Sequence, residues 1–195
     1  MKKAVFLDRD GTINVDYGYV YQYEKFEFIE GVLETLKKLQ KMGYALIIVT
    51  NQSGIARGYY TEEDMHLLHK KMCEDLEKEG IQITDIYYCP HLTGCTCRKP
   101  QLELFYRATK EHDIDLSHSI AVGDKMRDLS LCENEPVLGF WITQEEQSNE
   151  AILELRETDM ETLDLESDKR TGRVIRIKSI REIPDILNAS NSQLG

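Results

Sequence analysis

Short apolar runs alternate with segments of helical periodicity along this chain. Residues 3–8 and 44–50 are predominantly apolar, as strands buried on both faces are. Residues 31–42 instead carry apolar side chains at 32, 33, 36, 39 and 42, which share one face of a helix, and Gly43 supplies a helix stop. This order predicts an α/β protein in which helices cover a parallel sheet.

The alternation continues towards the C-terminus. Thr61 is followed by acidic residues, a sequence typical of a helix N-terminus, and this helix is predicted to run to about Glu79 and to end at Gly80. Further strands are predicted at residues 83–88, 119–123 and 137–142, with an edge strand at 173–178. The remaining predicted helices cover residues 102–112, 125–133 and 180–187. We assign no function to the acidic segment at about 144–171.

The composition limits the class of protein further. A chain of 195 residues is long enough for one hydrophobic core, so we expect a single domain over residues 1–195. No apolar run approaches the roughly 18 residues that a membrane span needs, and Asp8 ends the apolar N-terminal stretch too early for a signal peptide. We therefore expect a cytoplasmic protein, and a monomeric one. The net charge of −11 disfavours nucleic acid and anionic membranes as partners.

An acid pair follows the first predicted strand, in the sequence Asp8-Arg9-Asp10-Gly11-Thr12. Acids at positions i and i+2 leave a strand end on the same side, and the carboxyl ends of parallel strands are where ligands bind. One carboxylate can attack a phosphorus atom while the other lies near the leaving oxygen. Gly11 allows a sharp turn, and Thr12 can hydrogen-bond back to the acids. The alternatives are an exposed acidic turn or a calcium loop, but the residues that follow lack the calcium-loop spacing.

Three other predicted strand ends carry polar groups. Thr50 follows the second strand, Lys99 follows the third strand and its loop, and Asp124 follows the fourth, with Asp128 one helical turn further on. Taken singly, each has a structural interpretation as a helix cap or a surface lysine. Together, an acid pair, a hydroxyl, a lysine and an acid at four successive strand ends favour one site for a phosphorylated substrate. The lysine would offset locally the negative charge of the whole chain.

On these residues the chain resembles the haloacid dehalogenase superfamily, whose four motifs match Asp8/Asp10, Thr50, Lys99 and Asp124 in that order. The resemblance implies a doubly wound, Rossmann-like sheet. It implies that Asp8 is the nucleophile that forms an aspartyl-phosphate and that Asp10 is the general acid and then the base. Thr50 and Lys99 would hold the phosphoryl group. The implied ligands of a catalytic Mg²⁺ are the Asp8 carboxylate, the Asp10 main-chain carbonyl and Asp124, with Asp128 in support.

A cluster of cysteines indicates a second metal. The pattern C-x-H followed by C-x-C can close a tetrahedral structural Zn²⁺ site with no open position. The alternatives are buried thiols, reactive thiols or a disulfide, but cysteines crowded together in a cytosolic protein favour metal. The site would fix the loop that delivers Lys99. The predicted zinc ligands are Cys89, His91, Cys95 and Cys97, whereas Cys73 and Cys132 are predicted to be core residues.

Within the superfamily, the chain resembles the D-glycero-D-manno-heptose 1,7-bisphosphate 7-phosphatase family. The stretches that carry the resemblance are FLDRDGTIN, FEFIEGV, VTNQSGIARGYY, YYCPH, CRKP and VGDK. It implies hydrolysis of the 7-phosphate of a sugar bisphosphate, by an enzyme with a small zinc-binding loop and without a large cap domain. The implied sugar-phosphate contacts are Asp16, Tyr17, Gly18, Tyr19, Thr50, Asn51, Gln52, Ser53, Arg98, Lys99 and Lys125, to which we add Arg57 from its turn on the substrate side.

Two departures from that family point to a relative. Only three residues separate His91 from Cys95, and KPQLELF follows the lysine motif. Both features are more similar to the histidinol-phosphate phosphatase domain. The stretch SGIARG and the sequence Gly123-Asp124-Lys125 fit the heptose enzyme better, so we favour a heptose bisphosphate over histidinol phosphate or another small phosphate ester.

Other classes of function are less consistent with the sequence. A non-catalytic sugar-phosphate-binding module would have no need of both Asp8 and Asp10. A DNA-end phosphatase also uses D-x-D-G-T, but it would need a basic groove with exposed aromatic side chains to bind DNA. The net charge of the chain disfavours such a groove. The tyrosines at positions 17, 19, 21 and 23 are interpreted as a loop wall around the site, with a stacking surface as the alternative.

Overall fold

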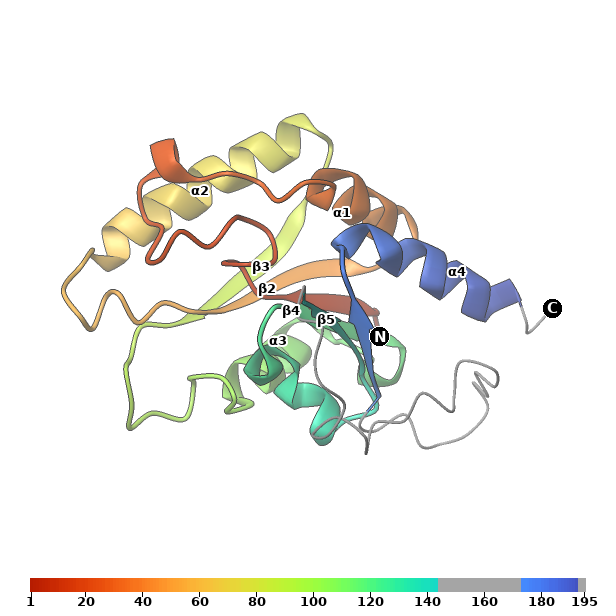
Figure 1. The fold of residues 1–195 in the computed structure, drawn as a ribbon. Helices are drawn as coiled ribbons and strands as arrows, with labels where there is room; N and C mark the ends of the chain where they lie inside the picture. Colours follow the sequence, from red (N-terminus) through yellow and green to blue (C-terminus); the bar gives the residue numbers. More distant parts are fainter. Residues whose placement is uncertain (144–172, 193–195) are drawn as a thin grey trace.

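The computed structural model describes residues 1–143 and 173–192 and contains a six-stranded sheet in which every strand pair is parallel (Figure 1). The strand order is β3-β2-β1-β4-β5-β6, the Rossmann order, so the predicted doubly wound sheet is confirmed. The predicted edge strand, β6, lies at the edge. The strands are β1 (Ala4–Leu7), β2 (Ala45–Asn51), β3 (Ile83–Cys89), β4 (Ile120–Gly123), β5 (Leu138–Ile142) and β6 (Val174–Ile177).

Helices cover both faces of the sheet. One layer contains α1, α2 and α4, and the opposite layer contains α3 and the 3-10 helix η3 (Figure 1). Alternate residues of β1 reach the two layers: Val5 and Leu7 join one core, and Phe6 joins the other. Burial on both faces explains why the strands are continuous apolar runs in the sequence. The helix bounds are α1 (Val32–Lys41), α2 (Glu62–Lys78), α3 (Glu103–His112), η3 (Met126–Glu133) and α4 (Ile183–Ser192).

Helix ends follow the sequence signals in part. The Thr61 hydroxyl accepts the Asp64 N–H, and the Asp64 carboxylate accepts the Thr61 N–H, which completes a capping box before α2. The terminal helix is longer than predicted: η5 (Ile180–Glu182) leads directly into α4. The predicted helix at 125–133 is a 3-10 helix in the structure. Two short 3-10 helices, η1 (Tyr23–Lys25) and η2 (Leu116–His118), were not predicted.

The topology leaves one edge of the sheet for a site. The strand order reverses between β1 and β4, and ligands of open parallel sheets bind at the carboxyl ends of strands beside such a reversal. Within residues 1–143, the chain between β1 and α1 contains only η1 as regular structure, and between β3 and α3 it contains only the cysteine-rich loop. The described chain therefore has no large cap domain there, as predicted.

Two predictions extend beyond this description. The acidic segment at about 144–171 lies outside the described residues, and a single domain over residues 1–195 stays a prediction. In the parts of the chain that the structure describes, no helix is both long and apolar enough to cross a membrane.

Candidate active site

Charged side chains from three separate segments meet at the carboxyl edge of the sheet. Asp8 follows β1, Lys99 comes from the loop after β3, and Asp128 lies in η3 after β4. The Lys99 ammonium lies 2.9 Å from Asp8 Oδ1 and 2.7 Å from Asp128 Oδ1, and it donates to the Val49 carbonyl at 2.6 Å. All three charged side chains are buried. Residues far apart in the sequence thus form one ion-paired cluster.

Lys99 is the cation at the centre of this cluster. Burial alone would lower the pKa of Lys99, but the carboxylates of Asp8 and Asp128 outweigh burial, so its pKa is raised above the ordinary value. The ammonium therefore stays charged. Asn51 fixes the lysine backbone, accepting its N–H at 3.0 Å and donating to its carbonyl at 3.1 Å. A buried cation held in this way can stabilise negative charge that develops beside Asp8.

Three carboxylates lie close enough to share a metal ion. One oxygen each from Asp8, Asp124 and Asp128 lies within 4.8 Å of the other two. Burial raises the pKa of Asp124, although the neighbouring Lys125 opposes the shift. Among the described residues, Asp124 Oδ1 is buried without a hydrogen-bond partner, which is costly unless a cation satisfies it. Oxygen ligands of this kind suit Mg²⁺, so the cluster fits the predicted ion; a contribution from the Asp10 carbonyl stays a prediction.

The Asp10 carboxylate belongs to a separate hydrogen-bond network. Its oxygens accept from Arg9 Nη2 at 2.9 and 2.8 Å, from Asn14 Nδ2 at 3.0 Å and from Gln52 Nε2 at 3.0 Å. Gln52 Nε2 also donates to Thr50 Oγ1 at 3.0 Å. The side chain of Asp10 is 18% exposed against 9% for Asp8. Gln52 therefore links the Asp10 carboxylate to the Thr50 hydroxyl, and Asp10 is the more exposed of the two acids.

Gly11 makes the close approach of two strand ends possible. Its φ is +87°, and a Cβ added there would lie 2.4 Å from Asp124 Oδ2. Gly11→Ala should therefore displace Asp124, lower activity by at least about tenfold and cost about 1–3 kcal/mol of stability. Gly80→Ala is the matched control, because Gly80 has φ +75° but open space around its Cβ position and lies away from the site. Steady-state rates and thermal unfolding of both variants test this; equal activity in both would contradict it.

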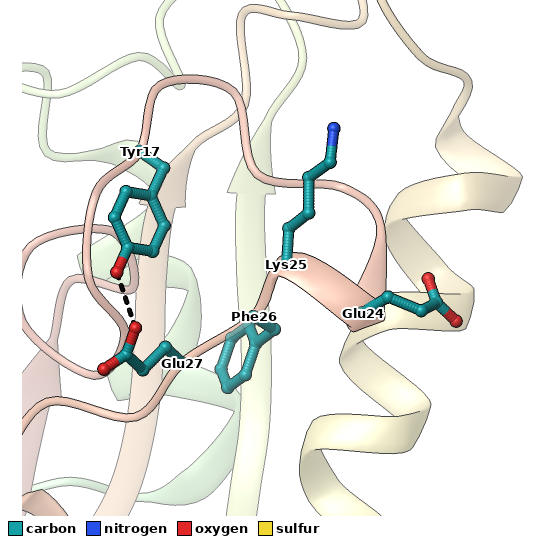
Figure 2. Close-up of a pocket in the computed structure, with 5 residues that line it drawn as sticks. All are labelled: Tyr17, Glu24, Lys25, Phe26 and Glu27. Carbon is teal, nitrogen blue, oxygen red and sulfur yellow. Dashed lines mark hydrogen bonds between the residues drawn. The ribbon is translucent and has the colours of Figure 1, made fainter.

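The loop after the acid pair connects to Asp124 through Lys125. The Lys125 ammonium lies 3.2 Å from both Asp16 Oδ2 and Asp124 Oδ2, and Gly18 N–H donates to Asp16 Oδ1 at 3.0 Å. Tyr17 makes a different contact: its hydroxyl donates to a Glu27 oxygen at 2.5 Å (Figure 2). The structure thus brings Asp16 and Lys125 to the cluster and directs the Tyr17 hydroxyl elsewhere. The cavity in Figure 2 is lined by Tyr17, Glu24, Lys25, Phe26 and Glu27, without any residue of the carboxylate cluster.

The predicted tyrosine cluster divides into two groups. Tyr19 is 44% exposed and packs edge-on against the exposed Tyr59, with ring centroids 4.8 Å apart. The Arg57 guanidinium lies 5.9 Å from the Tyr19 ring. Tyr21 and Tyr23 instead stack on other aromatic rings of the protein. The four tyrosines therefore do not form one continuous stacking surface, and Arg57 lies beside the exposed pair.

Two other predicted substrate contacts make bonds within their own loops. The Ser53 carbonyl accepts the Arg57 N–H at 3.2 Å and so closes the turn after β2. The Arg98 guanidinium donates to the His91 carbonyl at 3.0 Å. Although Arg98 and Lys99 are neighbours in the sequence, Arg98 bonds to the cysteine-rich loop and Lys99 bonds to the buried carboxylates.

The cysteine-rich loop brings its four predicted zinc ligands together. One ligand atom from each lies within 4.8 Å of the others. All the cysteines are free thiols, so the disulfide alternative is wrong. Cys89 Sγ lies 3.5 Å from Cys95 Sγ and 3.1 Å from Cys97 Sγ, and His91 Nδ1 lies 3.3 Å from Cys97 Sγ. These spacings approach the roughly 3.5–4 Å between ligands around a tetrahedral zinc ion, so the donor set fits that metal.

Sequence reasoning missed part of the network around Asp10. Arg9 and Asn14 bind its carboxylate directly, and neither was assigned a role. The position of Arg9, a cation between two acids in the sequence, could have indicated its role. His69, in α2, binds Arg9 and had no such signal because it lies far away in the sequence. The expectation for Thr12 was wrong: within the described residues its hydroxyl is buried without a hydrogen-bond partner.

An acid pair, a buried lysine and a carboxylate cluster at these strand ends define a phosphatase of the haloacid dehalogenase type. The chain belongs to the polynucleotide kinase 3 phosphatase family, whose family model matches residues 3–161.

Curated relatives and solved structures agree with this assignment. The chain is 49% identical over 137 residues to a D-glycero-beta-D-manno-heptose-1,7-bisphosphate 7-phosphatase of Haemophilus influenzae, covering 66% of this chain and 74% of that protein. It is 45% identical over 145 residues to the alpha-anomer enzyme of Campylobacter jejuni, covering 74% and 84%. The structure of D,D-heptose 1,7-bisphosphate phosphatase from B. bronchiseptica, complexed with magnesium and phosphate, matches with a TM-score of 0.75 and 25% identity, over 96% of this chain and 98% of that one.

Proposed function

We propose that this phosphatase removes the 7-phosphate of D-glycero-D-manno-heptose 1,7-bisphosphate through an aspartyl-phosphate on Asp8. The observation that carries the proposal is the Lys99 ammonium, 2.9 Å from Asp8 Oδ1 and beside a carboxylate cluster that fits Mg²⁺. The substrate is taken from the names of the relatives, which include enzymes for both anomers.

The first half-reaction transfers the phosphoryl group to the enzyme. A carboxylate oxygen of Asp8 attacks phosphorus, and the bond from phosphorus to the sugar oxygen breaks. Asp10 gives its proton to that oxygen, which leaves as a hydroxyl. Lys99 and the Thr50 hydroxyl hold the transferring group, because Lys99 is paired with Asp8 and Thr50 is linked to Asp10 through Gln52. Positioning and charge stabilisation of this kind supply most of the catalysis of phosphoryl transfer.

The second half-reaction regenerates Asp8. Asp10, now a carboxylate, takes a proton from a water molecule that attacks phosphorus, and the bond from phosphorus to the Asp8 oxygen breaks. Asp8, Asp124 and Asp128 would hold Mg²⁺, with the Asp10 carbonyl as a further ligand. When bound, the ion neutralises negative charge on the phosphoryl oxygens and reduces the repulsion between phosphate and Asp8.

Cations around the cluster would bind the rest of the substrate. Lys125 lies next to Asp16, and Arg57 lies beside the exposed Tyr19 ring. These two cations are the proposed partners of the second phosphate. Arg98 would take part after giving up its bond to the His91 carbonyl. The remaining proposed contacts are Tyr17, Gly18, Tyr19, Asn51, Gln52 and Ser53. We further propose that the protein acts as a cytoplasmic monomer, without nucleic-acid or membrane partners.

We also propose that Cys89, His91, Cys95 and Cys97 hold a structural Zn²⁺ that fixes the backbone leading to Lys99. Cys97→Ser should then lower the bound zinc from one equivalent per chain to a small fraction and destabilise the protein, because such a site contributes on the order of 10 kcal/mol to local folding. Cys73→Ser, in α2 away from the loop, is the control. Metal analysis and thermal unfolding measure both effects; unchanged zinc in Cys97→Ser would reject these ligands.

The experiment that tests the substrate is phosphate release with Mg²⁺ from both anomers of heptose 1,7-bisphosphate, histidinol phosphate and fructose 1,6-bisphosphate. We expect kcat/KM to favour a heptose anomer by about two orders of magnitude or more, about 3 kcal/mol of transition-state discrimination. A preference for histidinol phosphate would show that the short cysteine-rich loop indicates the substrate more reliably than the heptose-like motifs do.

A DNA-end phosphatase is the second candidate, because the description of the matching family names a polynucleotide kinase 3 phosphatase. The exposed Tyr19 and Tyr59 rings beside Arg57 are the feature that favours it, since aromatic rings stack on bases. The net charge of −11 opposes binding of a polyanion. An oligonucleotide with a 3′-phosphate in the same assay separates the two candidates.

A further inference from the structure

Arg9 is a fully buried cation behind the acid pair. Its relative exposure is 0%, yet it belongs to the turn that carries Asp8 and Asp10. Nη2 donates to both Asp10 oxygens, at 2.9 and 2.8 Å, and to the Val20 carbonyl at 2.8 Å. A buried guanidinium is tolerated only where its donors are matched by acceptors. Nε also donates to Asp10 Oδ1, at 3.3 Å, so Asp10 and the backbone supply acceptors for two of the three nitrogens, and Nη1 needs another.

His69, from α2, supplies that acceptor. Its Nε2 lies 3.0 Å from Arg9 Nη1, and the residue is buried. Because a guanidinium can only donate, Nε2 must be the acceptor, and the ring proton must reside on Nδ1. Burial, and then the charge of Arg9, lower the pKa of His69 to about 3. The neutral imidazole is therefore the form present at physiological pH.

We propose that His69 and Arg9 are positioning residues for Asp10: His69 fixes the guanidinium, and the guanidinium fixes the carboxylate in the orientation for proton transfer. The proposal rests on the proposed role of Asp10 as general acid and base. The series of contacts His69–Arg9–Asp10 runs from α2 to the end of β1. In this proposal, α2 contributes no group to the reacting phosphate, but it determines the orientation of the Asp10 carboxylate. Through its bond to the Val20 carbonyl, Arg9 also connects the loop after the acid pair to this network.

The leaving group of the substrate provides a selective readout. An alkyl phosphate needs a proton on its departing oxygen, whereas the nitrophenolate of p-nitrophenyl phosphate departs without one. The value of kcat/KM reports the steps up to departure of the leaving group. A misplaced general acid should therefore lower kcat/KM for the alkyl ester much more than for the aryl ester. A general loss of folded protein would lower both equally.

The test compares His69→Phe, which keeps a buried ring but removes the acceptor, with His69→Gln, whose amide oxygen can still accept from Arg9. We expect His69→Phe to lower kcat/KM by about 10–100-fold for the sugar phosphate that the wild type hydrolyses best, and by less than about threefold for p-nitrophenyl phosphate. His69→Gln should recover most of the loss. His66→Phe and His66→Gln, on the exposed side of α2, are matched controls and should retain wild-type values.

Asp10→Asn separates the two levels of the proposal. If Asp10→Asn discriminates between the esters but His69→Phe lowers both equally, or if His69→Gln is no better than His69→Phe, the positioning role is wrong and the role of Asp10 stands. If Asp10→Asn does not discriminate, the proposed role of Asp10 fails, and the positioning role fails with it. Should His69→Phe not fold, His69→Met removes the acceptor with a more adaptable side chain.

Discussion

Asp8→Asn should abolish turnover, with a loss of at least about 10⁴-fold in kcat, because the amide cannot form the aspartyl-phosphate. The protein should remain folded, since Lys99 keeps its 2.7 Å ion pair with Asp128. Phosphate release gives the rate, and calorimetry with a sugar bisphosphate gives the binding. Binding that survives the loss of turnover is the expected pattern for a nucleophile.

A matched substitution controls for the change of charge. Asp113→Asn also removes a carboxylate, but Asp113 is exposed, ion-paired to the N-terminus, and at φ +53°, where Asn is well tolerated. This variant should keep full activity. Wild-type turnover in Asp8→Asn would exclude the aspartyl-phosphate, and inactivity of the wild type towards every phosphate ester tried would favour a binding module.

Lys99→Met should cost both activity and stability. It removes the cation beside Asp8, the proposed nucleophile, so kcat/KM should fall by about 10²–10³-fold. It also leaves Asp8 and Asp128 buried without their partner, which typically destabilises a protein by about 3–5 kcal/mol. Denaturant unfolding measures the second effect. Lys70→Met, an exposed lysine of α2, is the control and should change neither quantity.

The stability loss of Lys99→Met should depend on pH. Burial already raises the pKa of Asp128, and Lys99 opposes that shift, so the variant should raise this pKa further. A group whose folded pKa exceeds its unfolded value contributes stability at low pH that is lost as the pH rises through the folded pKa. The deficit relative to wild type should therefore be larger at about pH 8 than at about pH 5. A stability deficit that is the same at both pH values would contradict the expectation that Lys99→Met leaves carboxylates buried without a partner.

Much of the fold was predictable from the chain itself. Continuous apolar runs predicted strands buried on both faces, and each predicted strand outside the acidic segment occurs within about two residues of its observed bounds, a normal disagreement at element ends. Thr61 and the acidic residues after it predicted the start of α2. The conformation of η3 was not predictable, because its winding depends on tertiary contacts: Asp128 packs against Gly123 and pairs with Lys99.

The candidate site was predictable as a set of residues but not as an arrangement. The acid pair, Thr50, Lys99 and Asp124 each lie at the end of a strand or in the loop after it, and parallel strands end at the same edge, so their meeting follows from order along the chain. The partner of each group does not follow. Asp128 was expected only to support a metal, yet it shares Lys99 with Asp8. Arg98 and Tyr17, expected at the substrate, bond within their own surroundings.

By itself the sequence determined the class of fold, the residues at the strand ends and the ligand types of two predicted metal sites, because these depend on periodicity and on chemistry within short segments. Only the tertiary structure decided that Lys99 lies between two carboxylates and that His69, in α2, contacts Arg9 behind the acid pair. Such contacts depend on distances of a few ångströms between distant segments, and packing of the whole sheet and its helices sets those distances.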